Sequence, residues 1–67
     1  MNEYQIKGNW NEVKGKIKEQ WGDLTDSQLD RIDGHADRLV GAIQRMYGRS
    51  LDEARREVDE WRDAGNC

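Results

Sequence analysis

Apolar residues recur every three or four positions along most of the chain, which is the spacing of one face of an α-helix. At about 100° per residue, each run places its apolar members on one side of its helix. The members of the four runs are Trp10, Val13, Ile17 and Trp21; Leu29 and Ile32; Ala36, Leu39, Val40, Ile43 and Tyr47; and Leu51, Ala54, Val58 and Trp61. The pattern predicts an all-α fold of four helices.

The boundaries of the predicted helices are marked by capping residues and by glycines. Two capping boxes, Thr25 with Gln28 and Ser50 with Glu53, predict where the second and fourth helices begin. The glycines that follow the first three helices, where a positive φ is common, are Gly22, Gly34 and Gly48. The start of the first helix is not marked in this way. We expect the fourth helix to fray near Ala64.

The sequence contains an approximate repeat at an offset of 26 residues. Residues 8–22 and 34–48 align with their glycines in register, and Ile17 matches Ile43. A capping box follows each copy. We interpret the repeat as a four-helix bundle of two packed helical hairpins, each a long helix followed by a shorter one, in an approximate internal duplication. The alternative is a chance resemblance between two amphipathic helices.

The 67 residues of the chain suit one small domain. We assign residues 1–67 to it, with an ordered part over about 4–62 and a tail over 63–67. Charged residues make up 37% of the chain and apolar ones 34%, but three regularly spaced tryptophans favour a folded core over disorder. The predicted core consists of Trp10, Val13, Ile17, Trp21, Leu24, Leu29, Ile32, Leu39, Val40, Ile43, Leu51, Val58 and Trp61.

The net charge of −3 disfavours binding to nucleic acid or to an anionic membrane. No run approaches the ~20 apolar residues of a membrane span, and the amino-terminal residues lack the apolar segment of a signal peptide. The single cysteine, Cys67, leaves either an intermolecular disulfide or an inert thiol. We therefore expect a cytoplasmic monomer without membrane association, whose partner, if it has one, is a protein.

The sequence offers no recognisable catalytic or metal-binding set. His35 is the only histidine, and nothing near it in the sequence supplies both a hydrogen-bonding partner and a nucleophile, so we expect a surface or helix-capping residue near Asp33 and Asp37. One His and one Cys do not build a zinc site. The acidic run before Gly34 fails as a calcium loop, because ligand positions 1 and 3 would be Leu29 and Arg31. We therefore expect neither an enzyme nor a cofactor.

Three lysines of the first helix form a candidate basic surface. Lys7, Lys14 and Lys18 fall within about 40° of one another on a helical wheel, beside the apolar stripe. Such a strip can contact phosphates, although three lysines supply only a small electrostatic contribution. The alternative is an ordinary solvated face.

Gly15 and Gly41 stand in the middle of two predicted helices, about 150° from the centre of each apolar stripe. A glycine within a helix costs about 1 kcal/mol relative to alanine. Because these glycines do not face the predicted core, we hypothesise that they admit the close approach of a partner or of a second copy. The alternative is that selection tolerates a weakened helix at these positions.

Several short motifs run through most of the chain. They are Gly8-Asn9-Trp10, Lys14-Gly15-Lys16, Lys18-Glu19-Gln20-Trp21-Gly22 and Leu24-Thr25-Asp26, followed by Leu39-Val40-Gly41, Ile43-Gln44, Tyr47-Gly48, Glu57-Val58 and Trp61. This set resembles the signature of the CsbD-like family of small bacterial stress-response proteins. The resemblance implies a protein made under general stress or in stationary phase, with a helical bundle similar to SAM-domain folds. The family has no established enzymatic role, so the resemblance assigns no catalytic residues.

Two functions of different classes follow. The first is a non-enzymatic stress-response protein that acts through binding or through its abundance, which suits a hydrophilic surface that stays soluble at high concentration. The second is a nucleic-acid-associated helical domain that uses the lysine strip, or Arg38 and Arg45 on the third helix. The predicted partner contacts are Lys7, Lys14, Gly15, Lys18 and Gly41.

Overall fold

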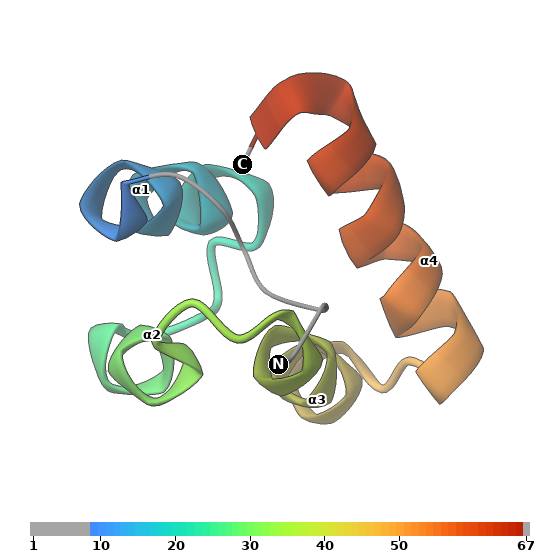
Figure 1. The fold of residues 1–67 in the computed structure, drawn as a ribbon. Helices are drawn as coiled ribbons and strands as arrows, with labels where there is room; N and C mark the ends of the chain where they lie inside the picture. The colour runs from blue at the N-terminus through green and yellow to red at the C-terminus, as the bar shows by residue number, and fades with distance from the viewer. Residues whose placement is uncertain (1–8, 67) are drawn as a thin grey trace.

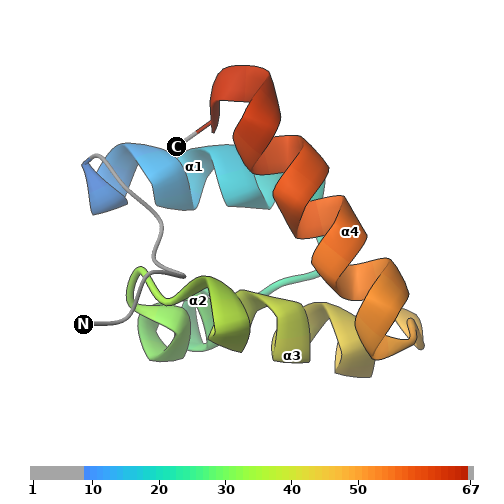
Figure 2. The same ribbon diagram turned by 45° about the vertical axis from the view of Figure 1, so that its right-hand side comes forward.

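The computed structural model describes residues 9–66, and within that range the chain forms helices and no β-strand. The elements are α1 (Trp10–Gln20), α2 (Asp26–Ile32), α3 (Ala36–Tyr47) and α4 (Leu51–Trp61), followed by a widened helical turn, η1 (Arg62–Asn66). In Figure 1 and Figure 2, α1 lies on one level, α2 and α3 share another, and α4 runs from the level of α3 to that of α1. The prediction of an all-helical fold with four helices is confirmed.

Side chains cap three of the four helix starts. The Thr25 hydroxyl accepts from the Gln28 N–H at 3.2 Å, and the Gln28 side chain accepts from the Thr25 N–H at 2.9 Å. Ser50 and Glu53 form the same pair of bonds at 3.1 and 3.0 Å. Both predicted capping boxes are therefore confirmed. Asn9, whose side chain accepts from the Asn11 N–H at 3.0 Å, marks the start of α1 that the sequence pattern left open.

The helix ends follow the predicted glycines in two of three cases. Gly48 ends α3 with a φ of 64°, and Gly34 follows α2 with a φ of 81°. The expected positive φ at Gly22 is wrong. There α1 ends because Trp21 itself leaves the helical conformation, with φ −128° and ψ 78°, and its carbonyl accepts from the Leu24 N–H at 3.1 Å. At the carboxyl end, α4 gives way to η1, where Gly65 leaves the helical conformation with a φ of 88°.

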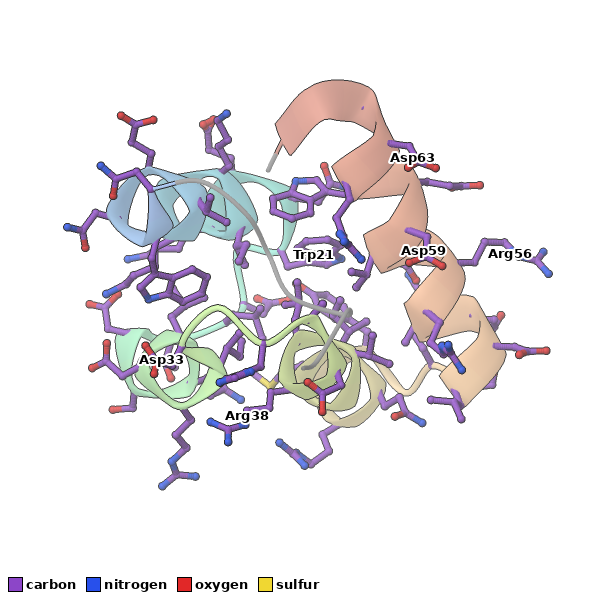
Figure 3. The ribbon with its side chains drawn as sticks, viewed as in Figure 1. Trp21, Asp33, Arg38, Arg56, Asp59 and Asp63 are labelled. Carbon is purple, nitrogen blue, oxygen red and sulfur yellow. The ribbon has the colours of Figure 1, made fainter. Side chains whose placement is uncertain are left out.

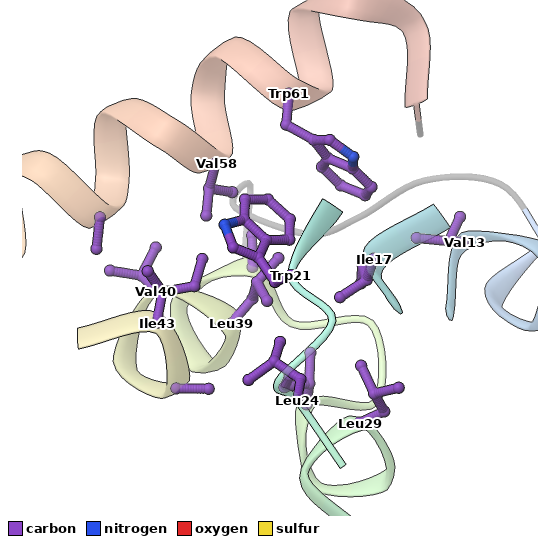
Figure 4. Packing of buried hydrophobic residues seen from close by; sticks show 14 residues of the cluster. Val13, Ile17, Trp21, Leu24, Leu29, Leu39, Val40, Ile43, Val58 and Trp61 are labelled. Atoms are coloured by element: carbon purple, nitrogen blue, oxygen red, sulfur yellow. The ribbon is translucent and has the colours of Figure 1, made fainter. Parts of the chain in front are cut away.

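The four helices and the turn after α1 enclose one apolar core (Figure 4). Trp10 and Tyr47 are half-buried and pack against its edge, so the prediction that Trp10 is a core residue is only partly right. The buried apolar residues are Val13, Ile17, Trp21, Leu24, Leu29, Ile32, Ala36, Leu39, Val40, Ala42, Ile43, Ala54, Val58 and Trp61.

Leu51 is the one predicted core residue that the structure places at the surface, with 53% of its area exposed. It is the first residue of α4. Because helical side chains lean toward the amino terminus, a side chain at the first position extends past the start of its helix. The exposed loop 48–50 lies there instead of another apolar helix. The prediction was wrong because Leu51 has the right spacing but stands beyond the covered part of α4.

Trp21 joins the end of α1 to α4 (Figure 4). Its ring lies 5.4 Å from that of Trp61, with the planes tilted by 58°, which is a favourable aromatic geometry. Its Nε1–H donates to Glu57 Oε1 at 3.3 Å, and Glu57 Oε2 accepts from Arg49 Nε at 2.7 Å. The indole is therefore held on its apolar faces by the core and at its polar edge by α4.

Candidate functional site

Two of the three lysines predicted as a basic strip are paired with aspartates of α2. Lys14 Nζ lies 3.3 Å from Asp30 Oδ1, and Lys18 Nζ lies 2.9 Å from Asp26 Oδ1. The hydrogen bond from Lys18, and then its charge, lower the pKa of the Asp26 carboxyl below its ordinary value. We call these four residues the lysine face. The remaining lysine, Lys7, lies outside the described residues.

The ion pairs change what the lysine face can do. Exposed pairs of this kind contribute little to stability, but each aspartate places a negative charge next to its lysine. A phosphate approaching Lys18 would meet the Asp26 carboxylate in the same place. The structure therefore places both lysines beside acidic partners on α2.

Gly15 and Gly41 lie on open parts of their helices. A Cβ built at either position would meet no atom within 4 Å. Gly15 is exposed on α1, whereas Gly41 is half-buried on α3 and lines a surface hollow. The two predicted glycine positions therefore have different surroundings, and only Gly41 borders a concave surface.

The hollow at Gly41 has a volume of about 340 Å³ and lies between α2 and α3. Arg38 and Arg45 stand on α3 on either side of Gly41, and Arg31 comes from the last turn of α2. In the view of Figure 3, Arg38 lies below α2 and α3, on the side away from α1. We call this site the arginine hollow. Its lining residues are Gln28, Arg31, Ile32, Arg38, Gly41, Ala42 and Arg45.

The arginine hollow carries uncompensated positive charge. Its lining includes three arginines and no acidic residue of the described chain. Arg38 Nη1 donates to the carbonyl oxygen of Arg31 at 3.0 Å, which ties the two helices together. Between residues 9 and 66, no hydrogen bond or ion pair engages the side chain of Arg31 or Arg45. In a chain with net charge −3, this is a local reversal of sign.

The sequence pattern pointed to Arg38 together with Arg45, and to Gly41 apart from them, but it did not point to Gln28 or Arg31 as site residues. Arg38 and Arg45 are seven residues apart, so they share one side of α3, and Gly41 lies between them. That spacing predicts from the sequence alone that the two arginines and Gly41 lie close together on α3. The contribution of α2 had no such signal, because it depends on how α2 packs on α3.

A second hollow, of about 220 Å³, runs along α4 and has mixed charge. Glu53 is occupied by its capping box, and the hydrogen bonds from Ser50, the backbone N–H first, lower the pKa of its carboxyl. Glu57 is held by Arg49 and Trp21. These side chains therefore already serve the fold.

The remaining candidates are a metal site, His35, a membrane span and Cys67. No group of three His, Cys, Asp or Glu residues in the described range is placed to hold a metal ion. His35 occupies the N-cap position of α3, but its side chain makes no capping hydrogen bond there. None of the helices of residues 9–66 is both long and apolar enough to cross a bilayer. Cys67 lies outside the described residues.

Residues 9–66 form a small all-helical unit with an arginine-lined surface hollow between α2 and α3. The sequence profile of the CsbD-like family matches residues 4–56, which is well over half of the chain. The chain therefore belongs to the CsbD-like family, which is associated with the general stress response. No curated protein and no solved structure matches the chain.

Proposed function

We propose that this chain is a non-enzymatic, cytoplasmic stress-response protein that acts as a monomer, through binding or through its abundance. The observation that carries the proposal is the CsbD-like match over residues 4–56, together with the stress association of that family. The match covers α1, α2, α3 and the first half of α4, so it includes both the lysine face and the arginine hollow.

The described surface supports a protein that stays soluble at high concentration. Charged residues make up 37% of the chain, and the large apolar side chains exposed between residues 9 and 66 are Met46 and Leu51 alone. Single exposed apolar residues do not form the extended patches that drive association. A binding role has its own support in the arginine hollow, where Arg31 and Arg45 make no hydrogen bond or ion pair within residues 9–66.

The test is made in the organism that encodes the chain. Abundance is measured before and during stress, and survival is compared between a deletion strain and the same strain carrying the intact gene. We expect the protein to accumulate under stress and the deletion to lower survival. Complementation with Arg45→Gln separates the two modes, because a role in abundance alone tolerates this exposed substitution. Equal abundance and equal survival in all strains would overturn the proposal.

A nucleic-acid-associated domain is the second candidate, and Arg38 and Arg45 in the hollow favour it. The pairing of Lys14 and Lys18 with aspartates removes much of the support that the lysines offered. A gel shift with duplex DNA and single-stranded RNA at low salt, repeated at rising salt, tests it. Salt-sensitive retardation supports this candidate. Free migration at low salt overturns it.

We also propose that the helices form two packed hairpins related by duplication, in a bundle similar to SAM domains. Lys14 pairs with Asp30 and Lys18 with Asp26, so the pairs run in opposite order along α1 and α2, as in an antiparallel hairpin. Ile17 and the matching Ile43 are both fully buried. An experimental structure in solution tests this arrangement through the contacts between α1 and α2 and between α3 and α4.

A further inference from the structure

We propose that the arginine hollow binds a small ligand that carries adjacent phosphate groups, with Arg31, Arg38 and Arg45 as the contacting residues. The inference rests on the proposed function, because it names a ligand class for a protein proposed to act by binding. It concerns neither the lysine face nor the mixed-charge hollow along α4.

The chemistry of the hollow selects an oxyanion. A guanidinium stays protonated in proteins and presents a planar set of N–H donors that matches phosphate in a bidentate geometry. Arg31 and Arg45 use none of these donors within the described chain, and Arg38 uses Nη1 for the Arg31 carbonyl. The side-chain amide of Gln28 adds a neutral donor at the α2 wall. No lining residue offers a carboxylate that would repel the anion.

The spacing of the arginines favours more than one phosphate group. Arg38 and Arg45 are separated by seven residues, which is about 10 Å along the axis of α3. Gly41 lies between them, and no side chain fills the floor there because its Cβ position is empty of neighbours within 4 Å. A single phosphate group would not reach both arginines along this distance as well as a chain of phosphates would.

Size and surroundings favour a small ligand over a nucleic acid. The volume of about 340 Å³ lies at the lower end of pockets that hold small molecules. No aromatic residue lines the hollow to stack a base. Asp30 and Asp37 stand next to Arg31 and Arg38 in the sequence, and with the net charge of −3 they oppose a long polyanion.

The first experiment uses inorganic triphosphate as the probe and isothermal titration calorimetry of the full chain at low salt. We expect saturable binding that Arg45→Gln weakens about tenfold, since it removes a charge-assisted contact. Arg56→Gln is the matched control. Arg56 points outward from α4, so this substitution removes the same charge far from the hollow (Figure 3). It should leave the affinity nearly unchanged. Thermal melts verify that both variants fold.

A second pair of variants adds charge in place of removing it. Gly41→Glu places a carboxylate at the floor of the hollow, and Gly15→Glu makes the same change on the exposed face of α1. Both positions leave a Cβ free of contacts within 4 Å, and Glu is a better helix former than Gly, so both variants should fold. We expect Gly41→Glu to abolish triphosphate binding and Gly15→Glu to leave it within about twofold.

Four results would overturn the inference. They are no heat of binding to the wild-type chain at low salt, equal losses in Arg45→Gln and Arg56→Gln, equal affinity for citrate or sulfate, and tighter binding to single-stranded RNA than to triphosphate. The proposed function fails separately, through unchanged abundance and survival. Stress protection without triphosphate binding overturns only this inference, and triphosphate binding without a stress phenotype overturns only the proposed function.

Discussion

The lysine face and the arginine hollow are two basic surfaces that share α2 but differ in how their charge is used. On the side toward α1, Lys14 and Lys18 are paired with Asp30 and Asp26. On the side toward α3, three arginines line one hollow without an acidic neighbour in its lining. The comparison shows that the number of cations on a helix does not by itself determine how much unpaired positive charge a surface presents. The acidic or basic side chains of the adjacent helix determine how much of that charge is paired.

The different outcome follows from the two sides of a short helix. Asp26 and Asp30 are four residues apart, so they lie on one side of α2, and Lys14 and Lys18 have the same spacing on α1. Two matched pairs can therefore form between these helices. Gln28 and Arg31 lie on another side of α2, and the facing residues of α3 are Arg38 and Arg45. Between α2 and α3, the positive charges of the three arginines therefore reinforce one another.

The largest effect is expected at Trp21, because unfolding the core removes the helices that carry both surfaces. Trp21 is 3% exposed and connects α1 to α4, so Trp21→Ala should destabilise the chain by about 3–5 kcal/mol, enough to unfold a domain of this size. Circular dichroism during thermal and urea denaturation measures this. Trp10→Ala is the control, and its loss should be clearly smaller because Trp10 is half-buried. An unchanged melt for Trp21→Ala would contradict the packing described.

Thr25→Ala should cost about 1 kcal/mol, because it removes the hydroxyl that accepts from the Gln28 N–H at the start of α2. Since α2 contributes to both surfaces, hydrogen exchange should speed up in α2 first. Ser50→Ala makes the matched change on α4 and should loosen that helix instead. Exchange that rises equally in both helices for both variants would show that the caps do not act locally.

Gly15→Ala places a methyl group on the exposed side of α1, and Gly41→Ala places one in the arginine hollow. Both should raise the free energy of unfolding by up to about 1 kcal/mol, since alanine is the better helix former and neither Cβ meets an atom within 4 Å. Urea denaturation with matched m-values measures the change. A loss of stability in Gly41→Ala alone would mean that the floor of the arginine hollow is more tightly covered than described.

The smallest expected effect is a change in the pKa of Asp26, which distinguishes a paired cation, Lys18, from an unpaired one, Arg45. Lys18→Gln should raise the pKa of Asp26 toward the ordinary aspartate value, because the ammonium that lowers it is lost. Arg45→Gln should leave that pKa and the stability unchanged. Carboxyl titration by NMR measures the first, and thermal denaturation measures the second. An unaltered Asp26 titration in Lys18→Gln would contradict the pair.

The Lys18–Asp26 pair also predicts how the stability of the fold changes with pH. A carboxyl with a folded pKa below its unfolded value stabilises the fold above the ordinary carboxyl pKa of about 4 and loses this contribution as the pH falls through the folded pKa. Asp26 and Glu53 both have lowered pKa values. Stability should therefore decline in acid, below about pH 4. Lys18→Gln should reduce the part of this decline that comes from Asp26.

Local pattern by itself determined the helices, most of their boundaries and most of the core. Helix formation and capping depend on residues within one turn of each other, so Thr25 with Gln28 and Ser50 with Glu53 were visible without a structure. The apolar spacing identified buried residues such as Ile17 and Ile43 because each helix has one side to bury. The family resemblance was equally visible in the order of short motifs.

The tertiary structure alone decided which surfaces meet. Lys14 and Lys18 have a clear position on α1, yet only the placement of α2 supplies the aspartates that pair with them. Leu51 has core spacing but is exposed at the start of α4, and Arg31 joins Arg38 only through the packing of α2 on α3. Charge pairing and burial depend on neighbours that are distant in sequence, and helical periodicity carries no information about them.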